Sequence, residues 1–497
     1  MLSNILTGLV NAVQPLHLLW CFIGLCVGTL FGALPGFSAT MAVAVMVPFS
    51  YVMEPQAALL MLSGVYCGGV YGGSIPAILV GIPGTPASAP TAIEGQALVR
   101  KGKSGEALGT CTFASAFGGF WSAIALLLFS PLLAKLAMKV GAPESVMIAL
   151  FGLSVVCLLS EGNMVKGVLI GFLSLLIGSM GQDPVLGYPR FTFGSSALIG
   201  GLSNVPIMIG IYSIPQVFDM LRSGTDTLGT ISDLSPLRVP WRSIKENLVN
   251  FVRSILIGVG IGIVPAAGPD VGAFVSYNEA KKASKHPEEF GNGAVDGIIA
   301  SEAANNAVTG GSLIPLITLS IPGSAPAAIF LGAMILHGMR PGPMLFTTQA
   351  ENIYTVMVGF AVINIMLFFV GYLFCRMSNH ILRIPQRMLA VFITVLAIVG
   401  SYSINQNMVD VISMFVAGVI GWLLGKRGFS MSPVALSLLL GRMLEQNLSL
   451  TLSIYDNFFM VFTRPLTCVF AALALVSIAF PFVRPLIKKL RNKRTAQ

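Results

Sequence analysis

Long apolar runs separated by short polar stretches dominate this chain. A helix needs about 20 apolar residues to cross a hydrocarbon core, and several runs are long enough for two passes or a hairpin. The runs are continuous and do not alternate in ten-residue pieces as barrel strands do. We therefore predict an all-α polytopic membrane protein with about ten to fourteen membrane-inserted helices. The runs lie near residues 17–53, 57–98, 105–134, 143–160, 163–181, 197–218, 248–278, 290–336, 352–375, 387–404, 408–425, 430–447 and 458–482.

Two patterns of helix breakers recur inside these runs. "YGGSIPAILVGIPGT" begins at Tyr71, and "TGGSLIPLITLSIPGS" begins at Thr309, with one residue inserted between Gly-Gly-Ser and Ile-Pro-Gly. Upstream, "GTLFGALPG" from Gly28 matches "GVGIGIVPA" from Gly258 in the spacing of its glycines and proline. Because both patterns recur in the same order, we interpret them as an internal duplication.

Basic residues indicate how the two copies are oriented. No Lys or Arg precedes Arg100, and later basic groups fall between apolar runs, with the densest in the tail "RPLIKKLRNKR". The positive-inside rule places these groups and the C-terminus in the cytoplasm and the N-terminus outside, although Lys135 and Lys139 do not fit. The copies are then antiparallel, which predicts an inverted repeat. We expect a first half at 1–218 (core motifs 17–109), a polar cytoplasmic linker at 219–247, a second half at 248–482 (core motifs 250–345) and a basic cytoplasmic tail at 483–497.

The breakers also predict where a substrate binds. Pro-Gly in mid-membrane exposes backbone groups, which persist only where protein or a water-filled cavity receives them. Interrupted segments at matching positions of inverted halves are typical of transporter binding sites. Half-helix N-termini favour an anionic group, and half-helix C-termini favour a cation. We expect two broken hairpins that form the walls of one site and move against a scaffold, as in an elevator-like transporter.

Candidate site residues come from the motif tips. Any single Ser or Thr among them is also a small residue suited to close helix packing. The predicted substrate-binding residues are Gly36, Ser38, Thr40, Ser74, Gly84, Thr85, Ser88, Gly268, Asn305, Asn306, Ser312, Gly323 and Ser324. The predicted coupling-ion residues are Asp270, Asn305 and Asn306.

The strongest polar signal is "ASEAANNAVTGGS". Glu302, Asn305 and Asn306 share one helix face, and such groups within a membrane are costly and usually functional. They would coordinate Na⁺ or hydrogen-bond a substrate carboxylate. The alternative places Glu302 at the interface and uses the asparagines to cap or cross-link helices. We expect Asp270 to be more buried than Glu302.

Composition and motifs narrow the function classes. The chain is 55% hydrophobic and 10% charged, and its net charge of +9 follows from cytoplasmic loops, so we expect no nucleic-acid partner. The seven cysteines lie in or beside apolar runs, which favours packing over disulfides or metal binding. "GKS" at Gly102 lacks the upstream glycine of a phosphate-binding loop, since Ala97 stands there. We expect no ATPase activity and no cofactor beyond a coupling Na⁺.

Three other classes stay open. A cation or proton exchanger without organic substrate would need conspicuous buried carboxylates. A membrane-embedded enzyme would need a catalytic constellation, which the four scattered histidines do not suggest. A purely structural membrane protein leaves the duplicated breakers unexplained.

The motifs resemble a known family, the large membrane subunit of the tripartite tricarboxylate transporters. The resemblance covers roughly 17–480 and is carried by "GALPGFSATMAVAVMVPF", "YGGSIPAILVGIPGTPASAPTAIEGQALVRKGKSGEALG" and "EEFGNGAVDGIIASEAANNAVTGGSLIPLITLSIPGSAPAAIFLGAMILHGMRPGP". Ala266 and Ser320 stand where the family pattern has glycine.

The resemblance implies a non-enzymatic secondary transporter that imports small di- or tricarboxylates across the bacterial inner membrane. It implies coupling to a Na⁺ or H⁺ gradient. It also implies two partners, a small four-helix membrane subunit and a periplasmic substrate-binding protein that delivers the carboxylate.

Overall fold

Helices form almost all of the chain in the computed structural model, as the apolar runs predict. The structure describes residues 2–34, 37–159, 164–183, 187–223, 235–265, 267–381, 385–455 and 457–494. Six of the described helices are long and apolar enough to cross a membrane, and further apolar helices are shorter. The six are Pro15–Ala33, Pro55–Val80, Ser104–Ala137, Ala350–Ser378, Arg387–Asn405 and Met408–Lys426. The expected all-α polytopic architecture is confirmed.

Contacts divide the chain into two compact units that do not follow the predicted repeat boundaries. The first unit comprises Met1–Lys135 and Val205–Trp422, and the second comprises Leu136–Asn204 and Leu423–Gln497. Packing units and duplicated halves are different properties, so the boundaries of the halves stay a prediction. The middle of the expected linker, residues 224–234, lies outside the described residues, and the helix before it extends to Ser223.

The first unit contains both copies of the breaker motifs, and the helices of the two copies follow the same order. The first copy consists of α2 (Pro15–Ala33), α3 (Ala39–Ser50), α4 (Pro55–Gly72), α5 (Ser74–Val80), η1 (Pro86–Ser88), α6 (Ala89–Arg100) and α7 (Ser104–Ala137). The second consists of α12 (Leu248–Ile263), α13 (Gly268–Ala283), η3 (Pro287–Glu289), α14 (Val295–Leu319), α15 (Ala325–Leu336), α16 (Leu345–Thr348) and α17 (Ala350–Ile381). The unit also holds α1 (Leu2–Ala12), α10 (Asn204–Ser223), α11 (Trp241–Glu246), α18 (Gln386–Asn405) and α19 (Met408–Lys426).

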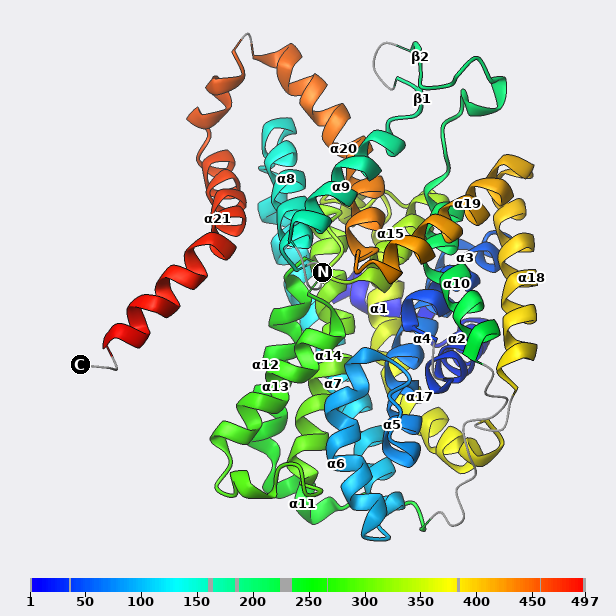
Figure 1. The fold of residues 1–497 in the computed structure, drawn as a ribbon, viewed down its shortest axis with the longest axis vertical. Coiled ribbons are helices and arrows are strands. Elements are labelled where there is room, and N and C mark those ends of the chain that lie inside the picture. Colours follow the sequence, from blue (N-terminus) through cyan, green and yellow to red (C-terminus); the bar gives the residue numbers. More distant parts are fainter. Residues whose placement is uncertain are drawn as a thin grey trace. The chain divides into compact units, whose positions relative to one another are not determined.

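Matching glycines hold the matching helices together. Helix α2 packs on α4, and α12 packs on α14, which Figure 1 shows beside α13. A Cβ at Gly28 would lie 2.3 Å from the Val65 carbonyl oxygen, and one at Gly258 would lie 2.5 Å from that of Ala304. These close backbone approaches have no room for a side chain, so the small residues are required by packing.

The same contacts give the register of the repeat. A Cβ at Gly72 would meet the carbonyl oxygen of Thr29, the residue after Gly28, and one at Gly311 would meet that of Val259, the residue after Gly258. Gly72 therefore corresponds to Gly311, and its successor Gly73 corresponds to Ser312. The two Gly-Gly-Ser motifs are therefore offset by one residue in space. The segment from Gly73 to Gly84 has the same length as the segment from Ser312 to Gly323.

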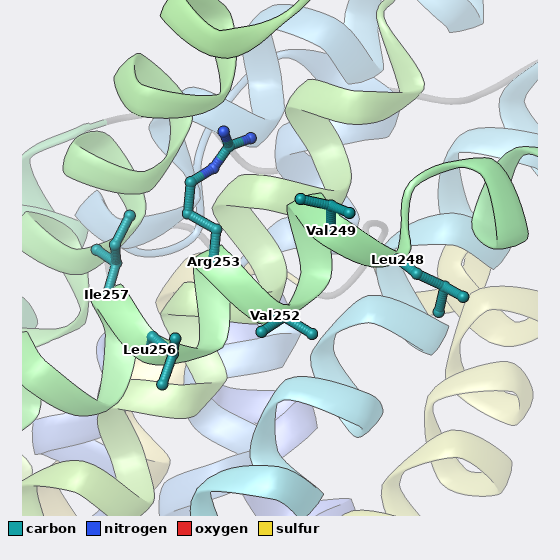
Figure 2. A pocket seen from close by; sticks show the side chains of 6 residues that line it. All are labelled: Leu248, Val249, Val252, Arg253, Leu256 and Ile257. Atoms are coloured by element: carbon teal, nitrogen blue, oxygen red, sulfur yellow. The ribbon is translucent and has the colours of Figure 1, made fainter.

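Helix α12 presents an apolar face away from the helices it packs on. Figure 2 shows six of its residues around a shallow pocket, five of them apolar. Among them Val249 is 79% exposed and Leu256 is 66% exposed. A face of this kind suits contact with lipid hydrocarbon or with another apolar helix. It is separate from the polar groups described below.

The second unit is built from helices and one short ribbon. Its elements are α8 (Ala142–Leu159), α9 (Met164–Gly178), β1 (Gly181–Gln182), β2 (Pro189–Arg190), η2 (Ser196–Leu198), α20 (Ser432–Ile454), η4 (Phe458–Thr463) and α21 (Pro465–Arg494). The strands pair antiparallel, with Gly181 opposite Arg190. Arg190 forms ion pairs with Asp183 and with Glu445 of α20, which ties the ribbon to that helix.

Candidate functional site

Each Ile-Pro-Gly turn folds back onto the helical segment that precedes it, at the junction of α4 and α5 in the first half and within α14 in the second. The Gly84 amide donates to the Gly73 carbonyl at 3.0 Å, and the Gly323 amide donates to the Ser312 carbonyl at 3.4 Å. A Cβ at Gly84 would lie 2.2 Å from the Gly32 carbonyl oxygen, and one at Gly323 would lie 1.9 Å from that of Gly262. Each turn therefore rests against the end of the broken helix of its own half.

Helices begin at these breaks, as the motifs predict. Ser38 caps α3 by accepting from the Met41 amide at 3.1 Å, and Ser324 caps α15 by accepting from the Ala327 amide at 3.3 Å. Helix α13 begins at Gly268, whose φ of +72° suits glycine and whose amide donates to the Gly323 carbonyl at 3.4 Å. Gly36, at the break before α3, lies outside the described residues.

The remaining tip residues of the first half lie together beside Gly73. The hydroxyls of Thr85 and Ser88 are 2.9 Å apart, and both residues are buried. A Cβ at Gly73 would lie 2.5 Å from the Thr85 hydroxyl and 2.7 Å from that of Ser88. Thr40, in the first turn of α3, is also buried.

Contacts also join the two halves around these tips. The first-half turn η1 packs on α13 and α14, and the second-half helix α15 packs on α3 and α4. The Tyr66 hydroxyl of α4 lies 2.9 Å from that of Ser312 and 2.7 Å from that of Ser324. Tyr66 was not among the predicted site residues, because a tyrosine in an apolar run carries no distinguishing local signal.

Asn305 and Asn306 lie in the middle of α14 and are completely buried. Within the described part of the chain, neither the nitrogen nor the oxygen of either side-chain amide has a hydrogen-bond partner. A buried amide left without partners costs roughly 1–3 kcal/mol, and such groups in a native protein call for an explanation, for example an ion or ligand. The capping or cross-linking alternative gains no support from these contacts.

Glu302, one turn earlier on α14, is also completely buried. Its Oε1 accepts from the hydroxyls of Ser74 and Thr91, each at 2.5 Å, and its Oε2 accepts from Ser115 at 2.6 Å. The alternative that Glu302 lies at an interface with water is therefore wrong. Ser74 points to this carboxylate from α5, next to the tip residue Gly73.

Asp270 is less buried than Glu302, so the expected order was wrong. It stands in the first turn of α13 and is partly exposed, whereas Glu302 is enclosed by helices of both halves. A Cβ at Gly268 would lie 2.5 Å from Asp270 Oδ1, so this carboxylate folds over the start of its own helix. Its role in ion coupling stays a prediction.

Glu94 of α6 is a further buried carboxylate, and the motif analysis missed it. It accepts from the Tyr277 hydroxyl at 2.7 Å and from the amides of Gly291, Gly293 and Ala294 at 2.6–2.8 Å. It thereby holds the segment that leads into α14. The sequence feature that could have identified Glu94 is its position as a lone acidic residue inside the apolar run 57–98, because such residues are usually functional.

No group of three or more His, Cys, Asp or Glu side chains suited to a metal ion occurs within the described part of the chain. The polar groups near the tips are hydroxyls, amides, single carboxylates and helix starts. This set suits an anionic organic ligand or a hard cation, which prefer amide and carboxylate oxygens or backbone amides.

Comparison with known proteins agrees with the motif analysis. Residues 18–436 match the family described as the tripartite tricarboxylate transporter TctA family. The chain is 36% identical over 495 residues, 99% of its length and 98% of the relative's, to an Agrobacterium vitis protein described as an uncharacterized 52.8 kDa protein in the TAR-I ttuC' 3' region. It is 35% identical over 47% of its length to a second A. vitis protein, from the TAR-II ttuC' 3' region, and covers 96% of that protein. No solved structure matches the chain.

Proposed function

Because this chain belongs to the tripartite tricarboxylate transporter TctA family, we propose that it carries small di- or tricarboxylates across the bacterial inner membrane. In this proposal a gradient of Na⁺ or H⁺ drives import. A periplasmic binding protein delivers the carboxylate, and a small four-helix membrane subunit completes the transporter. The N-terminus would lie in the periplasm and the C-terminus in the cytoplasm. The chain would act without enzymatic chemistry.

The observation that carries the proposal is the pair of unpartnered amides at Asn305 and Asn306. Amide N–H groups donate to carboxylate oxygens, and amide oxygens accept from a substrate hydroxyl or coordinate a cation. A ligand bound there would remove the cost of leaving these groups unpaired inside the protein. The helix starts at Ser38 and Ser324 add positive dipole ends in the same unit.

The burial of these amides also supports a moving carrier. A substrate reaches fully buried groups only if the helices around them rearrange, which is the requirement of alternating access. The hairpins α4–α6 and α14–α15 are the natural moving parts, because each is a helix, an Ile-Pro-Gly turn and a second helix. Their tight glycine contacts would let each hairpin move with its own broken helix as one body.

A second candidate function is cation or proton exchange without an organic substrate. The buried carboxylate of Glu302 favours it, since exchangers need such a group. In that case the amides at Asn305 and Asn306, together with Asp270, would serve the ion alone. The two candidates differ in whether any carboxylate crosses the membrane.

Uptake of labelled citrate and other di- and tricarboxylates into proteoliposomes separates the candidates. The liposomes contain this chain and the small subunit, with the binding protein added outside. We expect gradient-dependent uptake that falls at least about tenfold in Asn305→Ala and Asn306→Ala, because each loses a ligand bond inside the protein. Asn447→Ala is the matched control, since among the described residues its side chain bonds only the Met443 carbonyl of the same helix, α20. If no carboxylate were taken up although the binding protein and the small subunit were shown to be active, ion exchange would be the remaining candidate function.

A further inference from the structure

We infer that Glu302 is the proton-binding residue that couples a proton gradient to transport. The inference rests on the proposed function and adds the identity of the coupling ion and its site. Glu302 stands on α14, one turn before Asn305 and Asn306. Its three hydroxyl partners come from α5, α6 and α7, which belong to the first copy of the repeat. The carboxylate therefore joins the two halves of the unit.

Among the described residues, the Glu302 carboxylate has no basic partner to balance its charge. Within the described residues, no Lys, Arg or His forms an ion pair with Glu302. Charge at such depth is costly unless it is paired. The hydroxyl separations of 2.5–2.6 Å are those of O–H···O⁻ bonds. Hydrogen bonds alone support the ionised form, and one added proton removes the charge.

The hydroxyls of Ser74, Thr91 and Ser115 surround the Glu302 carboxylate and are called the cage below. Their hydrogen bonds can rearrange when the carboxylate binds a proton. When Oε1 takes a proton, it becomes a donor, and one hydroxyl that donated to it must turn away. Thr91 has a second partner for this, because its hydroxyl lies 2.8 Å from that of Ser301. Ser301 in turn donates to the Gly297 carbonyl at 2.9 Å. The new Glu302 O–H would then donate to the Thr91 oxygen, and the Thr91 O–H would turn to donate to the Ser301 oxygen, so that every hydroxyl keeps its own hydrogen and every group stays bonded.

Few other titratable groups face this site. The Cys111 thiol of α7 lies near the Glu302 carboxylate. On α6 and α13, Glu94 and Tyr277 bond each other and lie beside Gly297, which precedes Glu302 near the N-terminal end of α14. On α4, the Tyr71 hydroxyl bonds Thr112 of α7 and Cys375 of α17. None of these groups brings a positive charge to the carboxylate.

The cage connects directly to the first-half tip. Ser74 follows Gly73, whose carbonyl accepts the Gly84 amide of the turn. Thr91 stands one turn after Ser88, which bonds Thr85 at the same tip. A change of protonation at Glu302 therefore alters the bonds of both arms of the first hairpin. Through these bonds, protonation of Glu302 would change the structure of the substrate site.

The test compares driven uptake with exchange in the complete transporter. Proteoliposomes carry this chain and the small subunit with added binding protein, and labelled citrate is the probe. For Glu302→Gln we expect the stimulation by an inward proton gradient to be lost while citrate counterflow without a gradient remains. For Ser115→Ala we expect the pH midpoint of uptake to rise by about one unit, because one donor to the ionised form is gone. Ser122→Ala is the control on the same helix, since among the described residues the Ser122 hydroxyl bonds only the Gly119 carbonyl.

A spectroscopic readout separates this inference from the proposed function. Infrared difference spectra of the purified chain between low and high pH should contain a protonated-carboxyl band that Glu302→Gln removes. Full proton stimulation in Glu302→Gln, or stimulation of the wild type by a sodium gradient alone, would overturn the inference and leave carboxylate transport intact. Transport of no carboxylate by the wild type would defeat the proposed function, and the infrared band would still decide whether Glu302 binds a proton.

Discussion

The hydroxyl of Tyr66 lies 2.7 Å from that of Ser324, although 258 residues separate them in the chain. Tyr66 belongs to the first hairpin, and Ser324 caps the second helix of the other hairpin. The pair is buried, together with Ser312. One side chain thus joins a helix of the first copy to the turn of the second.

Removing this hydroxyl should weaken the join and keep the fold. Tyr66→Phe retains the ring and loses two hydrogen bonds, each worth about 1 kcal/mol. We expect a lower thermal unfolding midpoint in detergent and about a tenfold weaker apparent affinity for the transported carboxylate. Tyr402→Phe, at an exposed residue of α18, is the control. Unchanged midpoint and affinity in Tyr66→Phe would show that the second turn holds itself in place.

Adding a methyl group at either turn should be strongly destabilising. The new Cβ in Gly84→Ala or Gly323→Ala would meet a backbone carbonyl, which cannot move aside as a side chain end would. Overpacking costs about 1–3 kcal/mol, and we expect the upper end here. Thermal unfolding and expression yield measure the effect. Gly260→Ala on α12 is the control, because apart from neighbouring backbone of its own helix no atom of the described residues lies within 4 Å of the position of the new Cβ. An equal loss of stability there would refute the packing argument.

Glu94→Gln should loosen the segment that leads into α14. The carboxylate accepts three backbone amides, and a glutamine would turn an N–H₂ group toward some of these donors. The cost of unpaired buried donors is about 1–3 kcal/mol. Hydrogen exchange at Gly291, Gly293 and Ala294 should become faster in the variant. The control is Glu106→Gln, which removes a surface ion pair with Lys103 and should leave the exchange of these three amides unchanged. If exchange stayed slow in both variants, Glu94 would not be what holds this segment in place.

His337 should make stability fall in mild acid. Partial burial lowers the pKa of this histidine, which lies at the end of α15 with Nε2 3.0 Å from the Ser50 hydroxyl. The unfolded chain then binds a proton at a higher pH than the folded one, so stability is lost as pH falls below about 6.5. The thermal midpoint should drop less between pH 7 and pH 5 in His337→Gln than in the wild type. The exposed His286 provides the control as His286→Gln, which should follow the wild type.

Local sequence patterns predicted much of the fold. Continuous apolar runs identified the helices, because a backbone in lipid must satisfy its own hydrogen bonds. Pro and Gly inside those runs located the ends of α2 and α12 and the turns before η1 and α15. Asn305 and Asn306 stood out because amides are rare at such depth. The two-copy order of the elements in the first unit also follows from the motifs.

Tertiary contacts decided what the motifs left open. The offset between Gly73 and Ser312 depends on how each glycine packs on a distant carbonyl, which periodicity does not encode. The hydroxyls around Glu302 come from three other helices, and Glu94 reaches a segment about 200 residues away. Hydrogen-bond partners at such sequence separation are chosen by the packing of whole helices. The sequence by itself thus determined the class of protein and the positions of the breaks, and only the folded structure decided which buried polar groups are paired.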